Sequence, residues 1–209
     1  MSLRVDFPVY LITDRHQLAD GQSLLSACEA ALRGGITALQ LREKDLSAAE
    51  LLPLAQALRA LTHQYSACLL INDRVDVAMA CNADGVHLGG HSLPADTARA
   101  LLGPDKLIGV STHSLAEIDK AASHGADFVT FGPVYTTPSK AAFGAPQGLE
   151  KLRAACAASS LPVYALGGIK TTNHAEALST GATGIALISG ILAQPDPETA
   201  ARNFCLSSS

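Results

Sequence analysis

Three polar residues alternate at the end of one apolar segment in a pattern that suits anion binding. Gln40, Arg42 and Lys44 close the apolar run 38–42. Every second residue of an extended strand points to the same side, so these side chains are expected to converge. Two cations suit an anion, and the arginine fork suits a pair of phosphate oxygens. The alternative is a solvated loop in which Glu43 forms a salt bridge.

Asn72 and Asp73 follow the apolar run 68–71 in the same way. A carboxylate at that point could bind Mg²⁺, which takes few protein carboxylates together with substrate phosphates. The alternative is a side-chain cap for the short helix that follows.

Ser111 and His113 lie at the end of the run 107–111. Ser111 should face the pocket, and His113 lies where a general acid or base would serve. The alternative is that Ser114 caps a helix and His113 is a surface residue.

Glycines at the ends of two later apolar runs give the strongest evidence for a binding site. Gly167 and Gly168 follow the run 163–166, and Ser189 with Gly190 follows the run 184–188. Glycine lets the backbone approach a ligand closely, and the loops after strands seven and eight form the common phosphate site of barrel enzymes. The alternative is that these are plain turn glycines.

Two histidines carry a weaker signal. His87, inside the run 85–88, is more typical of a hydrogen-bonded core histidine than of a catalyst. His87 and His91 do not make a convincing metal pair, because no third ligand has suitable spacing.

These clusters can act together only if the strands that carry them end at one edge. Short Val-, Ile- and Leu-rich runs alternate with longer Ala- and Leu-rich segments of helical period. The runs cover 9–13, 38–42, 68–71, 85–88, 107–111, 128–131, 163–166 and 184–188. Continuous apolar strands are buried on both faces, as in a parallel sheet. The pattern therefore predicts an α/β fold, a (β/α)₈ TIM barrel with its active site at the C-terminal ends of the strands. An open doubly wound sheet is disfavoured, because no G-x-G-x-x-G motif follows the first run.

Sequence motifs also indicate where several helices begin and end. The segment 23–33 carries an apolar stripe and stops at Gly34. The segments 47–50 and 114–117 have the spacing of capping boxes. Pro53 fits poorly near the start of its helix, so that helix is expected to be kinked or to begin later.

A repeated turn supports the β/α array. Gly-Ala-Asp at 125–127 precedes a run and is echoed at 82–84 and 181–183. The segment 76–81 predicts a helix of one or two turns. The long irregular segment is 132–148, with three Pro and three Gly.

Composition limits the class of protein. A length of 209 residues suits one domain over 1–209, and 15 basic against 19 acidic residues, with no Lys/Arg cluster, argues against nucleic-acid binding. No apolar run approaches the roughly 18 residues of a membrane span, and the segment 1–8 lacks a secretory signal. Five cysteines without C-x-x-C spacing indicate small buried side chains in a reducing cytosol. We expect a cytoplasmic protein acting on small molecules; a homo-oligomer is compatible with such a barrel.

Seven motifs in order resemble the thiamine-phosphate synthase family, which also contains the thiazole tautomerases. The resemblance runs from about Tyr10 to Ile191. The motifs are QLREK at 40–44, IND at 71–73, GVHLG at 85–89, GVSTH at 109–113, GPVY at 132–135 with Thr137, Ser139 and Lys140, GAPQG at 144–148 and LGGI at 166–169. Any one of them would be weak evidence, but all of them in order are strong evidence.

The resemblance implies a (β/α)₈ barrel and a transferase. An aminomethylpyrimidine diphosphate loses diphosphate, and the nitrogen of a thiazole phosphate attacks the pyrimidine methylene. Preorganised cations and a metal at the departing diphosphate lower the barrier of such a step. The segment 136–148 could close as a lid that excludes water from a reactive cation.

Site residues follow from the same resemblance. The diphosphate would be held by Gln40, Arg42, Lys44, Asn72 and Lys140, and Asp73 would bind Mg²⁺. Ser111 would contact the pyrimidine, Thr137 and Ser139 would contact the thiazole phosphate, and Gly168, Ile188 and Ser189 would complete its cradle. Catalytic roles would fall on Ser111, His113, Lys140 and Arg42.

One metal position departs from the family pattern. The Asp that supplies a second metal ligand after Gly-Val-His-Leu-Gly is Ser92 here, and the acidic residue often found after Asn-Asp is Arg74. Either Arg74 substitutes for part of the Mg²⁺ charge, or the metal chemistry is gone.

Three functions are compatible with the sequence. A synthase is favoured, because the set Gln40, Arg42 and Lys44 would have no diphosphate to hold in a tautomerase. A thiazole tautomerase is the second hypothesis, motivated by the lost acidic ligand and by His113 as a proton carrier. A non-catalytic thiazole-phosphate-binding or regulatory protein is the third.

Overall fold

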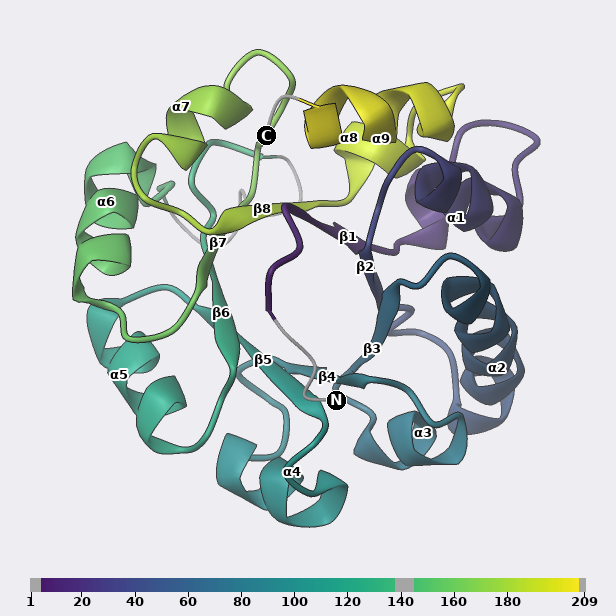
Figure 1. Ribbon diagram of the computed structural model, residues 1–209, viewed down its shortest axis with the longest axis horizontal. Helices are drawn as coiled ribbons and strands as arrows, with labels where there is room; N and C mark the ends of the chain where they lie inside the picture. Colours follow the sequence, from purple (N-terminus) through teal and green to yellow (C-terminus); the bar gives the residue numbers. More distant parts are fainter. Residues whose placement is uncertain (1–4, 138–144, 207–209) are drawn as a thin grey trace.

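Eight parallel strands close into a barrel in the computed structural model, which describes residues 5–137 and 145–206 (Figure 1). The strands are β1 (Val9–Ile12), β2 (Ala38–Leu41), β3 (Cys68–Asn72), β4 (Gly85–Leu88), β5 (Leu107–Thr112), β6 (Phe128–Phe131), β7 (Val163–Leu166) and β8 (Gly184–Leu187). Each predicted strand is confirmed to within one residue at either end. β1 pairs with both β2 and β8, so the open doubly wound sheet is excluded.

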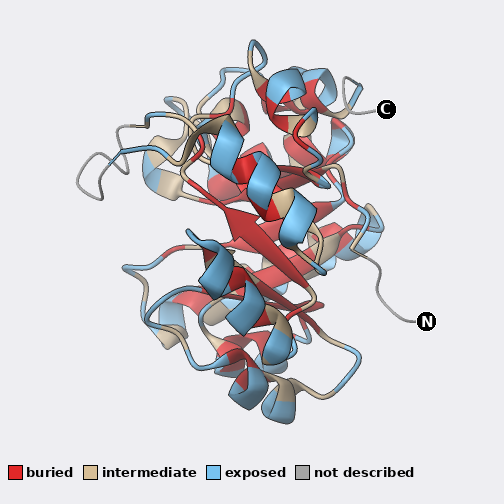
Figure 2. Cartoon of the chain, turned by 90° about the vertical axis from the view of Figure 1, so that its left-hand side faces the viewer, coloured by how far each residue is buried: buried red, intermediate tan, exposed pale blue. Residues whose placement is uncertain are grey.

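Helices surround this barrel and turn their polar faces to solvent (Figure 2). They are α1 (Leu24–Arg33), α2 (Ala48–Gln64), α3 (Val75–Ala80), α4 (Ala95–Leu102), α5 (Leu115–Ser123), α6 (Gly148–Ala158), α7 (His174–Leu178), α8 (Ser189–Leu192) and α9 (Pro197–Leu206). A short 3₁₀ turn, Arg15–Gln17, follows β1. No helix in the described ranges has the length and apolar character needed to cross a bilayer.

Two expected helix starts differ from the structure in detail. Ser47 and Glu50 form the predicted capping box, and α2 begins at Ala48 with Pro53 inside it, so the expectation of a later start is wrong. The reciprocal cap fixes the helix start before the proline is reached. At α5, Ser114 accepts from the Glu117 amide, but the Glu117 carboxylate bonds the amide of His113 instead of that of Ser114. Only half of the second capping box is therefore present.

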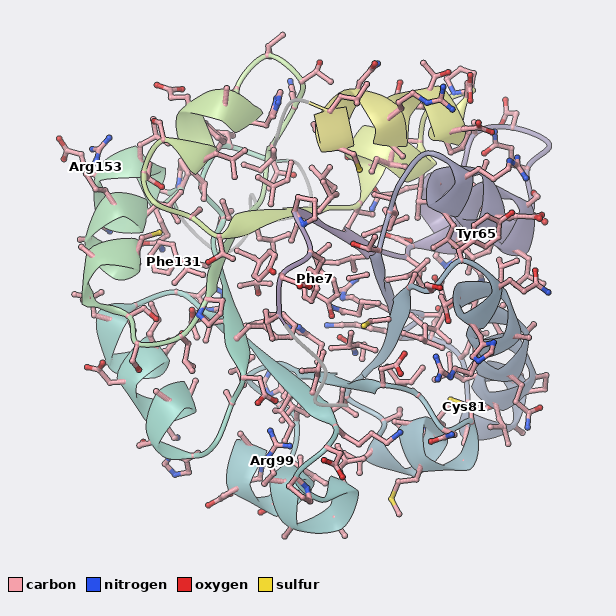
Figure 3. The ribbon with its side chains drawn as sticks, in the orientation of Figure 1. Phe7, Tyr65, Cys81, Arg99, Phe131 and Arg153 are labelled. Atoms are coloured by element: carbon pink, nitrogen blue, oxygen red, sulfur yellow. The ribbon has the colours of Figure 1, made fainter. Side chains whose placement is uncertain are left out.

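Aromatic side chains fill the N-terminal half of the barrel interior. Tyr10, Phe128 and Tyr164 come from three strands and form one buried cluster with Phe7. Phe7 lies within the ring of strands (Figure 3). The Phe7 ring stacks on Tyr164 with centroids 4.8 Å apart and meets Phe128 edge-on at 5.5 Å. Among the described residues, this plug fills the end of the barrel at which the strands begin, so we expect a ligand to approach from the C-terminal ends of the strands.

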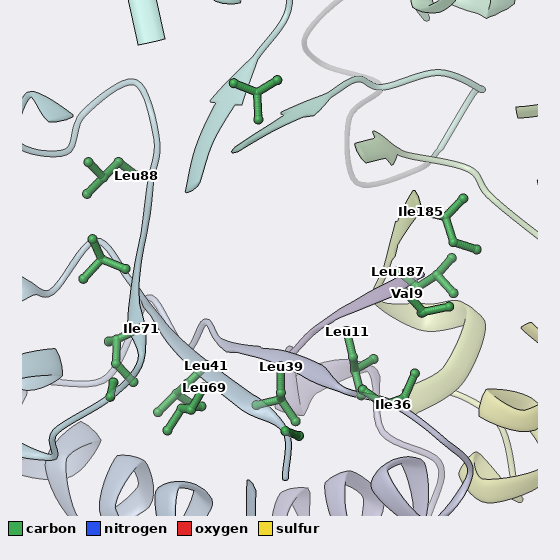
Figure 4. Packing of buried hydrophobic residues seen from close by; sticks show 14 of the residues in the cluster. Val9, Leu11, Ile36, Leu39, Leu41, Leu69, Ile71, Leu88, Ile185 and Leu187 are labelled. Carbon is green, nitrogen blue, oxygen red and sulfur yellow. The ribbon is translucent and has the colours of Figure 1, made fainter. Parts of the chain in front are cut away.

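Outward-facing strand residues form a second apolar layer against the helices. Val9, Leu11, Leu39 and Leu69 lie in this layer, each fully buried (Figure 4). Burying one such side chain stabilises the fold by about 1.5–3 kcal/mol. Burial on both faces explains why the strand sequences are continuously apolar.

The repeated turn before the strands has a structural cause at the plugged end. Asp84 accepts the Leu69 amide and the Arg59 guanidinium, both at 2.8 Å. Asp127 repeats the arrangement one unit further, with the Ile108 amide at 2.7 Å and Arg99 at 2.6 Å. These carboxylates join the start of one strand to its neighbour and to a helix, which is a role in stability at the end of the barrel remote from the strand tips.

Candidate active site

A chain of hydrogen bonds crosses the barrel interior beneath the strand tips. Gln40 Nε2 donates to the Tyr10 hydroxyl at 3.0 Å, and that hydroxyl lies 3.4 Å from His87 Nδ1. His87 Nε2 lies 3.0 Å from Ser111 Oγ. The four side chains come from β2, β1, β4 and β5, so the barrel brings together groups that are up to 101 residues apart in sequence, as the numbers 10 and 111 show.

The proton positions in this chain follow from burial. Desolvation, together with the nearby Arg42 charge, lowers the pKa of His87 to about 3, so its ring is neutral near pH 7. Burial raises the pKa of Tyr10, which keeps its proton. The hydroxyl accepts from Gln40 and therefore donates to Nδ1, which leaves the His87 proton on Nε2. Nε2 then donates to Ser111, and the Ser111 hydroxyl keeps its own proton for an acceptor in the barrel mouth.

Space for the His87 ring is provided by a glycine on the next strand. A Cβ at Gly109 would lie 2.6 Å from His87 Nδ1 and 2.4 Å from the Phe128 ring. His87 is 3% exposed and packs among Tyr10 and Phe128. The prediction of a hydrogen-bonded core histidine is therefore confirmed, and its partner is the predicted site residue Ser111.

Arg42 and Lys44 follow β2 at the rim of the barrel. Arg42 is partly buried and lies two residues after Gln40, which belongs to the hydrogen-bonded chain that ends at Ser111. A hollow of about 250 Å³ adjoins them, lined by Asp14, His16, Arg42, Glu43, Lys44 and Asp45. Glu43 forms the salt bridge of the alternative hypothesis, with Arg15, but its side chain is buried, whereas Lys44 is exposed.

The predicted metal ligand lies at the tip of β3. Asp73 is exposed, adopts φ +66°, and its amide donates to the His87 carbonyl at 2.9 Å. Arg74 turns away to pair with Asp76, and Ser92 Oγ accepts the Gly89 amide at 2.7 Å. Arg74 is therefore engaged on its own helix, and Ser92 stabilises its own turn. Across residues 5–137 and 145–206, no group of three His, Cys, Asp or Glu side chains could hold a metal ion.

His113 directly follows β5. It is exposed, and its Nδ1 lies 3.1 Å from Glu117 on α5. Glu117 also accepts the His113 amide at 2.6 Å. The structure brings Ser111 into the central hydrogen-bonded chain and leaves His113 outside it, so an acid–base role for His113 stays a prediction.

The loops after β6 and β7 pack closely because of two glycines. Gly168 has φ +69°, and a Cβ there would lie 2.7 Å from Tyr135 Cβ and 2.9 Å from the Thr136 carbonyl oxygen. Gly167 has φ +98°, and its Cβ would lie 2.6 Å from Pro133 Cβ. These positions require glycine, which explains the signal seen in the sequence. The Gly168 backbone therefore lies directly against the segment that leads to Thr137.

The loop after β8 lies at the same end of the barrel. Ile188 precedes α8, which begins at Ser189, and the first amides of a helix have no partner within it. The prediction of a strand through Ile188 is corrected by one residue, because the chain leaves the sheet at Leu187. Ser139 and Lys140 lie outside the described residues, as does most of the predicted lid 136–148.

Two inward residues were missed by the sequence analysis as site groups. Tyr10 joins Gln40 to His87, and a tyrosine inside a buried strand should have suggested that its hydroxyl needs a partner. Thr130 pairs in register with Ser111, is 1% exposed, and its hydroxyl has no partner among the described residues. Strand alternation could have placed Thr130 on the inner face.

Comparisons with known proteins agree with this geometry. Residues 9–191 match the family described as thiamine monophosphate synthase. A protein of Geobacter sulfurreducens, provisionally named a thiamine-phosphate synthase, is 58% identical, with 95% of this chain and 93% of the relative covered. The thiamine-phosphate synthase of Roseiflexus castenholzii is 45% identical, with 94% and 86% covered.

A solved structure extends the similarity to three dimensions. The thiamine phosphate pyrophosphorylase of Pyrococcus furiosus superimposes with a TM-score of 0.88 at 36% identity, and 96% of this chain and 94% of that chain are covered. The similarity therefore covers the whole barrel together with the loops that carry the site.

Proposed function

This chain belongs to the thiamine monophosphate synthase family, and we propose that its barrel mouth joins an aminomethylpyrimidine diphosphate to a thiazole phosphate. The products are thiamine phosphate and diphosphate, which makes the protein a transferase of thiamine biosynthesis. The observation that carries the proposal is that Arg42, Ser111 and Gly168 all lie at the C-terminal ends of strands of one closed barrel, in a chain that is 58% identical to a relative over 95% of its length.

The reaction breaks one bond and forms one. The bond from the pyrimidine methylene carbon to the diphosphate oxygen breaks, and its electron pair leaves with the diphosphate. The lone pair of the thiazole ring nitrogen forms the new bond to the methylene carbon, and the ring becomes cationic. Negative charge therefore grows on the diphosphate in the transition state, and fixed cations there lower the barrier.

The residues proposed to hold the diphosphate lie mainly at the ends of β2 and β3. Arg42 and Lys44 would supply the cations, Asn72 would supply an amide, and Lys140, which lies outside the described residues, would add a further cation. Gln40 gives one amide hydrogen to Tyr10, and the second amide hydrogen remains for a diphosphate oxygen. Removing one hydrogen-bond donor that stabilises charge developing in the transition state commonly lowers the rate about 10²–10³-fold.

Ser111 would contact the pyrimidine. Its hydroxyl accepts from His87 and is left as a donor, so it suits a ring nitrogen that presents a lone pair. The neutral, buried His87 holds this polarity at all pH values well above 3. Tyr10 and His87 thus act on the substrate through Ser111.

The thiazole phosphate suits the glycine-lined loops on the other side of the rim. Thr137 and Ser139 would donate hydroxyls, and the backbone at Gly168, Ile188 and Ser189 would donate amides. The close packing of Gly168 against Tyr135 supports this assignment, because it holds the loops after β6 and β7 together. The two substrates would then approach each other across the barrel mouth.

The side chains fit Mg²⁺ only if the substrate brings most of its ligands. Asp73 is an exposed carboxylate without a hydrogen bond to the described residues, and Mg²⁺ is often held by one carboxylate plus substrate phosphates. When bound, the ion would neutralise charge on the diphosphate. Ser92, bonded to Gly89, offers no carboxylate in support.

His113 separates the synthase from the tautomerase hypothesis. Bond formation at the thiazole nitrogen moves no proton, whereas a tautomerase must move one within the ring. The exposed His113–Glu117 pair could serve the second reaction, because Glu117 holds Nδ1 and leaves Nε2 for transfer. The curated relatives reported above bear the synthase name, and we favour that activity.

The assay that tests the proposal supplies both substrates and measures diphosphate release, with and without Mg²⁺. Release that needs both substrates is the expected result. Proton exchange into the thiazole without diphosphate release would instead identify a tautomerase. Binding of thiazole phosphate without either activity would identify the non-catalytic protein.

A further inference from the structure

A buried carboxylate stands between the two cations that follow β2. Glu43 lies between Arg42 and Lys44 in sequence, yet its side chain is only 1% exposed. Burying a carboxylate is costly unless it is paired and hydrogen-bonded. The partners of Glu43 therefore decide what this residue does for its neighbours.

All of the hydrogen-bond partners of the Glu43 carboxylate in the described chain come from the segment that follows β1. Thr13 Oγ1 donates to Glu43 Oε1 at 2.7 Å, and the Arg15 amide and Nη1 each donate to Oε2 at 3.1 Å. The carboxylate is thus neutralised by Arg15. Its charge is therefore paired within the segment that follows β1.

Thr13 also fixes the backbone of Arg42. Its hydroxyl accepts the Arg42 amide at 2.8 Å while it donates to Glu43, and its own amide donates to the Gln40 carbonyl at 2.9 Å. Thr13 is 0% exposed, so water does not compete for these bonds. Three consecutive bonds therefore fasten the end of β2 to the end of β1.

Arg15 extends the attachment past Lys44. Its Nη1 also donates to Asp45 at 2.6 Å, and Nη2 donates to the second Asp45 oxygen. Arg15 lowers the pKa of Asp45, so this carboxyl stays ionised. Carboxylates on both sides of Lys44 are held by one guanidinium, which limits the conformations open to that residue.

We propose that Thr13, Arg15, Glu43 and Asp45 form a clamp that positions Arg42 and Lys44 to bind the diphosphate. The inference rests on the proposed function, in which these two cations hold the leaving group. β2 ends at Leu41 and residues 42–45 form a loop and turn, so the pairing of both carboxylates with Arg15, and not strand alternation, is the physical basis. The clamp keeps the acidic residues paired with Arg15, so they do not neutralise the cations that the diphosphate needs.

The test measures binding of inorganic diphosphate by calorimetry, together with KM for each substrate. Thr13→Val removes both hydroxyl bonds and should weaken diphosphate binding about 10–100-fold, since small misplacements of binding groups have effects of this size. KM for the thiazole phosphate should not change. Thr13→Ser keeps the hydroxyl and should bind diphosphate to within about threefold of the wild type, by the same reasoning.

A matched pair separates positioning from stability. Glu43→Gln and Asp84→Asn each neutralise a carboxylate that accepts one backbone amide and one arginine, at opposite ends of the barrel. Both should lower Tm, but only Glu43→Gln should weaken diphosphate binding. If Glu43→Gln does not fold, Thr13→Val and Thr13→Ser carry the comparison.

Different experimental results would refute the clamp and the proposed function. A wild-type protein that releases no diphosphate from the two substrates refutes the function. Active wild-type protein, with diphosphate affinity in Thr13→Val and Glu43→Gln equal to that in Asp84→Asn, refutes the clamp and leaves the function standing.

Discussion

Tyr10→Phe tests the hydrogen-bonded chain under the active site. The change removes one hydroxyl at a 0% exposed position and leaves Gln40 Nε2 and His87 Nδ1 without their partner. An unsatisfied buried polar group costs about 1–3 kcal/mol. The contact to His87 is long at 3.4 Å, so most of the loss comes from Gln40. We expect the free energy of unfolding to fall by about 2–3 kcal/mol, measured by urea denaturation.

The kinetic effect of Tyr10→Phe should exceed what lost stability explains. In this variant no tyrosine hydroxyl donates a hydrogen bond to His87 Nδ1. His87 can then take the other tautomer, with its proton on Nδ1, and the Ser111 hydroxyl is no longer fixed as a hydrogen-bond donor to the substrate. We expect kcat/KM for the pyrimidine substrate to fall about tenfold, which corresponds to roughly 1.4 kcal/mol. The assay is steady-state diphosphate release at saturating thiazole phosphate.

Tyr164→Phe is the matched control. Tyr164 is a second fully buried tyrosine on the inner face, but its hydroxyl donates to the Phe7 carbonyl at 3.0 Å, at the plugged end of the barrel. It should lose about 1–2 kcal/mol of stability and keep wild-type kinetics. Equal kinetic parameters for the two variants would refute the reasoning that Tyr10 acts on the substrate through His87 and Ser111.

Three further predictions concern single residues. Because the folded-state pKa of His87 is about 3 and its ordinary value is 6.5, the unfolded chain binds more protons between these limits, so stability should fall as pH drops through that window. The slope is at most about 1.4 kcal/mol per pH unit and should be missing from urea titrations of His87→Asn; an unchanged slope would argue against a neutral ring. Gly168→Ala places a Cβ 2.7 Å from Tyr135 Cβ and should raise KM for the thiazole phosphate at least about tenfold. Gly125→Ala, at φ +82° with open space around it, should lose only about 1–2 kcal/mol of stability, and a similar KM for both variants would count against the cradle. His113→Gln should keep diphosphate release within about threefold, because the joining step moves no proton at the ring nitrogen; a loss of two orders of magnitude would reveal a proton transfer that the account lacks.

The positions of the strands could be predicted because strands that are buried on both faces appear in the sequence as continuous apolar runs. The apolar runs ending at Leu88, Phe131 and Leu166 match the strands to the residue. Closure of the sheet was predictable from the number of units and from the missing dinucleotide-binding motif. The capping box at Ser47 was predicted correctly, and only the later start suggested by Pro53 was wrong, because the reciprocal cap fixes the start of α2 at Ala48.

Which polar residues meet inside the barrel was harder to predict than where the strands lie. Alternation placed Gln40 and Ser111 on the inner face, but the contacts of His87 with Tyr10 and Ser111 depend on register between strands that are far apart in sequence. Glu43 shows the same limit. The sequence suggested a salt bridge for it, whereas its burial and its bonds to Thr13 depend on how the loops after β1 and β2 pack.

The central claim is that Arg42 acts on the departing diphosphate from the shared barrel mouth. The measurement that tests it most directly is the rate of diphosphate release by Arg42→Ala with both substrates saturating, against Arg202→Ala, which removes an exposed arginine on α9. The account predicts a loss of about 10²–10³-fold for Arg42→Ala and none for Arg202→Ala. Release by Arg42→Ala at the wild-type rate would contradict it.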